Sequence, residues 1–256
     1  MVSGNVIILR KGGRILNTKK GFNTRALVAC GLLAAISIVL TRVFSYMIPL
    51  AGLPALRIGF GDIPVIISGI LFGPIAGGLT GGVSDILGFI LNPMGGPYIP
   101  GFTISAVLRG LIPGVIFWLI REKNIKFNFH IANMIFSIFL TIGILFVFLS
   151  QEVDLSKALM MVYGVIAFAF IMLPVVLSRV IKSEDTLYSF DKILFIVTVC
   201  YFIISLGLNT FWLAITYEKG FLAFLPGRIL AGFVMIPLHS FMIFVLSRWF
   251  KYIKIS

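Results

Sequence analysis

The chain has 256 residues, of which 59% are hydrophobic and 12% are charged, and its mean hydropathy is +1.10. A soluble domain carries about 25% charged residues, so this composition excludes an ordinary soluble domain. The formal net charge is +12, but the basic residues flank apolar runs and form no single patch. We attribute this charge to membrane topology and to attraction by anionic membrane lipid, and we expect no nucleic-acid partner.

The first 23 residues form a basic tail that contains Arg10, Lys11, Arg14, Lys19 and Lys20. The apolar run that follows is too long for the core of a signal peptide, and no small-residue cleavage site ends it. We therefore expect a cytoplasmic tail, 1–23, followed by a helix that is retained.

Eight apolar segments follow, at 24–48, 59–72, 74–92, 101–120, 131–150, 157–180, 190–216 and 222–248. Most approach the 20 residues or so that cross a hydrocarbon core of about 30 Å. Segment 59–72 is short, and Gly73-Pro74 separates it from the next, so the two form either two spans or a re-entrant hairpin. The sequence predicts an all-α polytopic membrane protein with a single membrane domain, 24–256.

Lysine and arginine indicate the orientation of these segments. Fifteen of the 21 basic residues fall in the tail and in alternate connections, whereas the intervening loop 150–156 is acidic. Because basic residues are enriched on the cytoplasmic side, both termini are predicted to be cytoplasmic.

Four further arginines are predicted at the outer side of the membrane or within its outer third: Arg42, Arg57, Arg109 and Arg228. An arginine near the bilayer centre costs at least about 2.5–3.5 kcal/mol, so its presence needs a reason. One interpretation pairs these arginines with Asp62 and Asp85 or with lipid headgroups. The other is an outward-facing pocket for an anionic ligand, because the guanidinium fork suits a carboxylate.

Aromatic and amide groups accompany the arginines. Tyr98 and Phe102 lie in NPMGGPYIPGFTISAVLRG, 92–110, whose prolines and glycines predict a stiff, sharply turning lid above Arg109. Asn209 and Trp212 lie in the outer half of segment 190–216. An interfacial aromatic belt for Trp212, or a helix–helix hydrogen bond for Asn209, explains these two as simply as a ligand does.

Motifs for enzymatic or metal chemistry are missing from the sequence. It contains no GxxxxGK[ST] phosphate loop, no HExxH and no GxSxG. His130 and His239 have no metal-ligand partner at suitable spacing, and the two cysteines are too few for a metal framework. We expect no catalytic residues, no cofactor and no metal.

Small residues mark two segments for close helix packing. Ala26, Cys30 and Ala34 recur every four residues in the first segment and suit either a partner protein or internal packing. The third segment carries Gly77, Gly78, Gly81 and Gly82, for which internal packing is favoured.

Three blocks of sequence resemble the folate-specific substrate-binding (S) component of energy-coupling factor (ECF) vitamin transporters. They are FGDIPVIISGILFGPIAGGLTGGVSDILGFI, GGPYIPGFTISAVLRGLIPG and LNTFWLAITYEKGFLAFLPGRILAGFVMIPL, and the resemblance covers about 24–120 and 190–250. It implies a six-helix binding protein of a prokaryotic cell membrane that captures folate from outside. It also implies assembly with a transmembrane coupling subunit and two cytoplasmic ATPases, which agrees with the missing phosphate loop.

The resemblance has further implications for particular residues. It implies that Ala26, Cys30 and Ala34 face the coupling subunit. Segment 121–189 departs from the family and is interpreted as an inserted two-helix hairpin, which leaves 24–120 and 190–250 as the core. The expected substrate site comprises Arg42, Arg57, Asp85, Tyr98, Phe102, Arg109, Asn209, Trp212 and Arg228. The alternatives are an S component for another vitamin or precursor and, less favoured, an intramembrane enzyme or scaffold.

Overall fold

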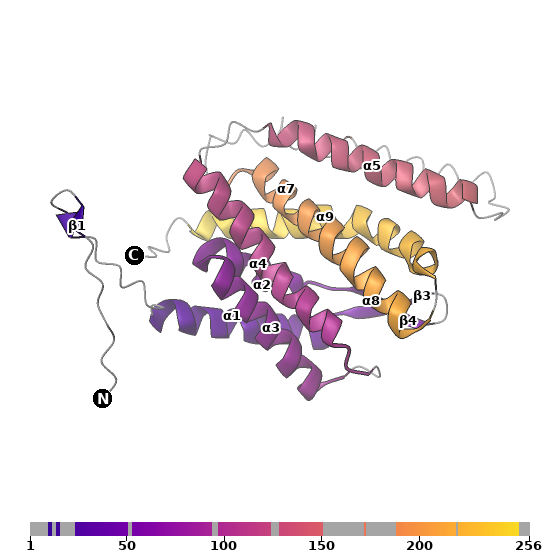
Figure 1. The fold of residues 1–256 in the computed structure, drawn as a ribbon, viewed down its shortest axis with the longest axis horizontal. Helices are drawn as coiled ribbons and strands as arrows, with labels where there is room; N and C mark the ends of the chain where they lie inside the picture. The colour runs from indigo at the N-terminus through magenta and orange to yellow at the C-terminus, as the bar shows by residue number, and fades with distance from the viewer. Residues whose placement is uncertain are drawn as a thin grey trace.

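The computed structural model describes residues 10–11, 14–15, 24–50, 53–93, 97–123, 128–150, 172, 188–218 and 220–250. In chain order its elements are β1 (Arg10–Lys11), β2 (Arg14–Ile15), α1 (Thr24–Arg42), β3 (Tyr46–Leu50), β4 (Leu53–Ile58), α2 (Asp62–Phe72), α3 (Pro74–Leu91), α4 (Pro100–Lys123), α5 (Phe129–Ser150), α7 (Phe190–Cys200), the π-helix η1 (Tyr201–Leu208), α8 (Asn209–Thr216) and α9 (Phe221–Phe250). Figure 1 shows these helices as one bundle. The acidic loop 150–156, most of the basic tail and nearly all of segment 157–180 lie outside the described residues.

The described helices confirm a mostly helical membrane protein. Five of them are long and apolar enough to cross a membrane: Thr24–Arg42, Pro74–Leu91, Pro100–Glu122, Phe190–Thr216 and Phe221–Arg248. The start of α1 and the end of α9 lie at the same end of the bundle (Figure 1). The helix count of the whole chain and its orientation in the membrane stay predictions.

Helix α2 explains the short second segment of the sequence. Its 11 residues extend only about 16 Å, which is too short to cross the membrane alone. Every residue from Ile63 to Ile70 is buried, so protein surrounds the helix on all sides. The turn to α3 passes through Gly73, whose φ of 93° favours glycine, and Pro74 then opens α3.

A β-hairpin in this mostly helical protein corrects the predicted extent of the first helix. The apolar run 24–48 was expected to be one helix, but α1 ends at Arg42 and the chain continues into strands β3 and β4. These strands pair antiparallel, with Pro49 opposite Pro54 at an irregularity in the ladder. Proline cannot donate a ladder hydrogen bond and disfavours a continuing helix, so both prolines suit a short, irregular hairpin. A second, two-residue ladder joins β1 and β2.

Glycines let α2, α3 and α4 approach to backbone contact. A Cβ atom added at Gly110 of α4 would lie 1.9 Å from the carbonyl oxygen of Gly77 in α3. One added at Gly69 of α2 would lie 2.2 Å from the carbonyl oxygen of Gly110. One turn further along α3, a Cβ atom added at Gly81 would lie 2.0 Å from the carbonyl oxygen of Ala106. The glycines of α3 are therefore internal packing residues, as the sequence favoured.

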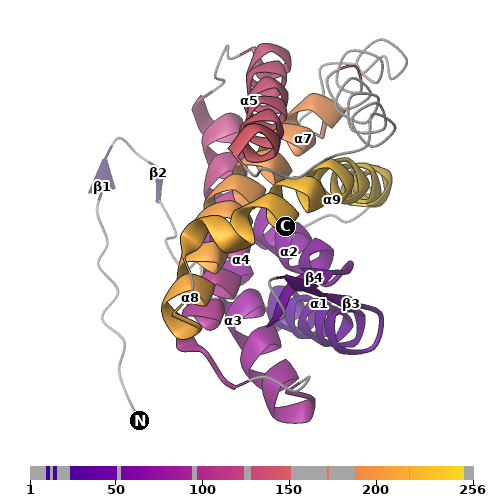
Figure 2. The same cartoon turned by 90° about the vertical axis from the view of Figure 1, so that its right-hand side faces the viewer.

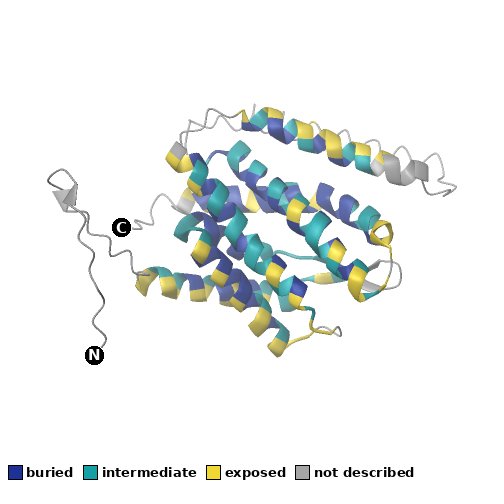
Figure 3. Cartoon of the chain, in the orientation of Figure 1, coloured by how far each residue is buried: buried dark blue, intermediate teal, exposed yellow. Residues whose placement is uncertain are grey.

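Helix α5 lies at the edge of the bundle, on α7 and α9. The ring of Phe136 lies 5.0 Å from that of Phe202, and Nδ2 of Asn133 donates to the carbonyl of Asp191 at 3.0 Å. Figure 2 places α5 and α1 at opposite edges, with α4, α7 and α9 between them. Figure 3 shows that both edge helices are exposed along their outer faces. That α5 belongs to an inserted hairpin stays a prediction.

We expect Gly110→Ala to destabilise the protein, because the new methyl group would collide with backbone atoms that cannot rotate away. Overpacking of a tight core costs about 1–3 kcal/mol. Thermal unfolding in detergent measures the effect. The matched control is Gly31→Ala on α1, where an added Cβ meets nothing within 4 Å. Equal stability of the two variants would contradict the proposed role of this contact.

Candidate substrate cavity

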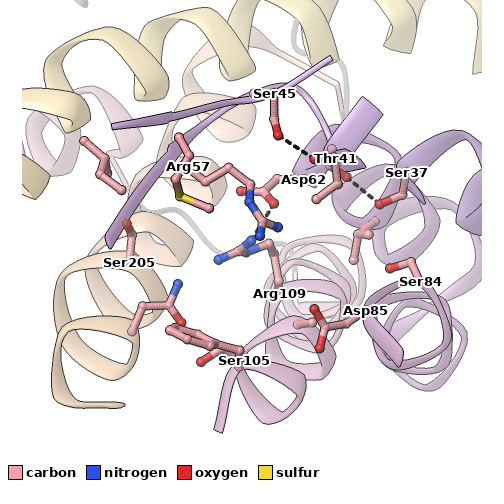
Figure 4. A pocket seen from close by; sticks show the side chains of 18 of the residues that line it. Ser37, Thr41, Ser45, Arg57, Asp62, Ser84, Asp85, Ser105, Arg109 and Ser205 are labelled. Carbon is pink, nitrogen blue, oxygen red and sulfur yellow. Dashed lines mark hydrogen bonds and ion pairs between the residues drawn. The ribbon is translucent and has the colours of Figure 1, made fainter. Parts of the chain in front are cut away.

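A cavity of about 240 Å³ lies in the half of the bundle that carries the β3–β4 hairpin. Side chains from the hairpin and from α1, α2, α3, α4, α7, η1, α8 and α9 line it. Eight of the nine predicted site residues are among them: Arg42, Arg57, Asp85, Tyr98, Phe102, Arg109, Asn209 and Arg228. The fold thus gathers residues from distant parts of the sequence around one space (Figure 4).

Trp212 is the predicted site residue that does not line the cavity. Its indole lies against the first turn of α4, where a Cβ atom at Gly101 would come 2.2 Å from Trp212 Cδ2. Because Gly101 has no side chain, the indole can lie directly on the backbone. In this structure Trp212 packs α8 against α4.

Arg109 forms an ion pair with Asp62. Its Nη1 donates to Asp62 Oδ1 at 2.5 Å and so joins α4 to the first turn of α2. The sequence left two acidic partners open for the arginines, and the structure selects Asp62 for Arg109. Asp85 instead accepts a hydrogen bond from Thr103 Oγ1 at 2.7 Å. The Tyr98 hydroxyl lies 2.7 Å from Thr103 Oγ1 and donates to it, because the Thr103 proton is already used.

Two other arginines are held by backbone carbonyls. Arg42 Nη1 donates to the carbonyl of Asn92 at 2.9 Å, which places a cation at the end of α3, where the helix dipole favours it. Arg228 is 4% exposed, and its Nη1 donates to the carbonyl of Ser205 at 3.0 Å. Ser205 lies in η1, a π-helical stretch of the kind that is frequent at functional sites. Both guanidinium groups are therefore fixed within the wall of the cavity.

Arg57 differs from these three arginines. It comes from β4, reaches into the cavity and donates no hydrogen bond to any described residue; its Nε is buried. Burial, reinforced by the charge of Arg42, lowers the pKa of the Arg57 guanidinium, yet an arginine stays charged at neutral pH. Figure 4 shows the Arg57 and Arg109 side chains pointing toward the same part of the cavity. Arg57 is thus a partly buried cation whose side chain points into the space where a ligand would lie.

Several lining residues had no signal in the sequence. Small hydroxyl residues face the cavity from four helices: Ser37, Thr41, Ser84, Ser105 and Ser205. In an apolar helix such residues also bond to the preceding turn, so their type alone does not mark a site. His239, for which the sequence offered no metal-ligand partner, lines the cavity, and its Nε2 lies 2.9 Å from the carbonyl oxygen of Gly59 in a hydrogen bond.

The small-residue row of α1 faces inward. Cys30 is 8% exposed and Ala34 is 4% exposed, because α1 packs against α2 and α3. The row thus makes contacts within the chain, which was one of its two interpretations, and its role toward a partner protein stays a prediction. The exposed face of α1 carries another pair of small residues four positions apart, Gly31 and Ala35.

Comparison with known proteins gives the family of the chain. A model of the family described as the S component of the ECF-type riboflavin transporter matches residues 21–183. The chain belongs to this S-component family. It is therefore a multi-pass membrane protein of a transporter family and not of an enzyme family, which agrees with the sequence. The matched range includes α5.

Individual relatives of this S component cover less of the chain. The folate transporter FolT of Clostridium novyi (strain NT) is 41% identical over 92 residues, which are 36% of this chain and 50% of that protein. An uncharacterized MG098 homolog of Mycoplasma pneumoniae is 32% identical over 92 residues, which are 36% of this chain and 19% of that protein. The chain thus spans half or less of the length of these relatives.

A solved structure shares the fold of this S component. The crystal structure of FolT bound with folic acid superposes with a TM-score of 0.53 at 19% sequence identity. The match covers 88% of this chain and 94% of that one. At this identity the comparison establishes the fold.

We expect the Arg109–Asp62 pair to stabilise the fold. Arg109→Ala and Asp62→Ala should each cost about 1–3 kcal/mol, between the values for exposed and buried pairs, because each leaves a partly buried charge without its partner. The double variant should recover part of this loss. Thermal unfolding of all four proteins without ligand measures the coupling, and strictly additive losses would show that the pair is not stabilising.

Proposed function

We propose that this S component binds folate within the membrane, from the outer side, and delivers it through a transporter complex. The observation that carries the proposal is Arg57, a partly buried guanidinium that donates no hydrogen bond to a described residue and faces a cavity already lined by three other arginines. A ligand with carboxylates would pair with these groups, and such charge-assisted, forked hydrogen bonds are among the strongest in proteins. Folate carries two carboxylates on its glutamate.

The aromatic wall of the cavity supports a ligand with a flat ring. Phe89 and Tyr98 lie with their ring centroids 5.0 Å apart, and Phe102 lines the same space. Aromatic side chains stack favourably on flat ring systems. Asn209 adds a buried amide oxygen without a partner among the described residues, which suits the amino groups of a pterin.

Riboflavin is the second candidate, because the matching family model carries its name. Riboflavin has a flat ring system but no carboxylate. Binding it would displace water from the Arg57 cation without supplying a counter-charge, which is costly. The 41% identity to the Clostridium novyi folate transporter over 92 residues also favours folate.

Transport requires partners in this proposal. The sequence has no phosphate loop, so energy would come from two cytoplasmic ATPases acting through a transmembrane coupling subunit. The protein reconstituted alone should bind folate without accumulating it. Accumulation in ATP-free vesicles that contain only this chain would exclude the proposed dependence on partners.

Calorimetry with the purified protein tests the ligand directly. Folate should bind, and riboflavin should bind far more weakly or not at all. Mass spectrometry of the small molecule that copurifies provides an independent identification. Tight riboflavin binding without folate binding would replace the proposal by its alternative.

We expect Arg57→Ala to weaken folate binding by about 2–5 kcal/mol, which is roughly 30- to 3,000-fold in Kd, because a desolvated carboxylate would lose its partner. Arg57→Lys should recover only part of the affinity, since lysine cannot form the fork. The control is Arg121→Ala, which removes an exposed arginine outside the cavity. Unchanged affinity of well-folded Arg57→Ala protein would remove Arg57 from the site.

The exposed face of α1 gives a prediction for the coupling subunit. Gly31→Trp and Ala35→Trp should impair copurification with that subunit and leave folate binding nearly intact, because bulk there blocks the close approach of a helix. Ala34→Trp should instead destabilise the chain, since Ala34 is buried. The control is Ile142→Trp on α5, 58% exposed at the opposite edge. Normal copurification of both α1-face variants would place the coupling interface elsewhere.

A further inference from the structure

Asp62 occupies a position that a ligand carboxylate would also suit. Its Oδ1 accepts from Arg109 Nη1, and the side chains of Asp62 and Arg109 are 35% and 21% exposed. Both residues line the cavity. Asp62 is therefore a carboxylate of the protein itself, placed on one of the cations that face the ligand space.

The wall of the cavity carries more positive than negative charge. Among the described lining residues, four arginines stand against two aspartates, Asp62 and Asp85, so the excess is two positive charges. Asp85 is engaged by the hydroxyl of Thr103, and Asp62 by Arg109. A ligand with two negative charges would balance the cavity, whereas a third would meet no further excess cation.

The location of Asp62 suits a carboxylate beside the ligand space. It lies in the first turn of α2, where the N-terminal end of the helix dipole favours an anion. The guanidinium of Arg109 lies beside it and forms the ion pair. The Asp62 carboxylate is thus held in the cavity wall by the start of α2 and by Arg109.

We propose that Asp62 is a specificity-determining residue that sets how many negative charges the cavity accepts, by neutralising Arg109. This inference rests on folate as the ligand class. It gives the ion pair a role in selection: with Asp62 present the cavity matches a dianion, and without its charge the cavity matches a trianion.

Three ligands that share one ring system test this inference. Pteroate carries one carboxylate, folate carries two, and folate extended by a second glutamate carries three. Calorimetry measures their affinities for the wild-type protein and for Asp62→Asn, which keeps the side-chain size and can still accept a hydrogen bond from Arg109. We compare the affinity for the three-carboxylate ligand with the affinity for pteroate, as a ratio. This ratio should rise at least about tenfold in Asp62→Asn, because the variant no longer repels the additional ligand carboxylates.

The comparison of ratios controls for the longer ligand, because any part of it that extends beyond the cavity does so in both proteins. Glu122→Gln removes one negative charge from an exposed position outside the cavity and should leave the ratio unchanged. An unchanged ratio in Asp62→Asn with folate binding intact would overturn the inference, and so would an equal loss of affinity for all three ligands. The second of these outcomes would make Asp62 a positioning residue for Arg109.

The wild-type protein provides a measurement that does not depend on a variant. The gain in affinity from folate to the three-carboxylate ligand should be smaller than the gain from pteroate to folate. Equal gains in affinity would overturn the inference even if Asp62→Asn did not fold. Absence of binding to all three ligands by the wild-type protein would contradict the proposed function itself. The two failures are therefore distinguishable.

Discussion

The backbone contact between α2, α3 and α4 is the constraint on which the cavity depends. Gly110 touches both Gly77 and Gly69 through main-chain atoms, so three helices meet with no side chains between them. This contact fixes how far the start of α2 lies from the middle of α4. Arg109 is adjacent to Gly110, and its ion pair with Asp62 forms at that distance. Wider spacing would separate the two charges and leave each buried without its partner, which is expensive in the bilayer.

The arginines of the cavity are kept in an apolar bundle by different means. Asp62 neutralises Arg109, while the end of α3 and the carbonyl of Ser205 in η1 hold Arg42 and Arg228. Arg57 differs, because it comes from a strand and donates no hydrogen bond to a described residue. Nη1 of each of the other three arginines donates to the protein, so a partly buried arginine that makes no such bond to a described residue indicates a ligand. This contrast is the basis for the proposed anionic substrate.

Non-helical backbone occurs where the membrane can tolerate it. The β3–β4 hairpin and residues 97–99 of the predicted lid both line the cavity, so their free backbone groups have protein or water around them. The outer faces of α1 and α5, in contrast, are regular helix with exposed apolar side chains such as Leu32 and Ile142. The bundle thus combines a lipid-compatible exterior with a polar interior at one end.

The sequence by itself determined the membrane class, the approximate bounds of most helices and eight of the residues that line the cavity. Hydropathy runs and the cost of burying arginine are local properties, so they can be read without a structure. Arg42, Arg57, Arg109 and Arg228 were identified because they fall outside the basic cytoplasmic segments, at a depth where arginine is costly. The family resemblance added the S-component interpretation, which the match over residues 21–183 supports.

Only the tertiary structure decided which charges meet and which faces are buried. The sequence left Asp62 and Asp85 open as partners for the arginines as a group, and helix packing at the glycines brought Asp62 to Arg109. The hairpin was hidden in an apolar run because strands and helices in a membrane protein share the same residue types. Trp212 was placed by its depth along a helix, and Ala26, Cys30 and Ala34 of α1 were identified by their four-residue spacing. Their rotation about the helix axis, which sends Trp212 onto Gly101 and Ala34 into the core, depends on neighbouring helices far away in the sequence.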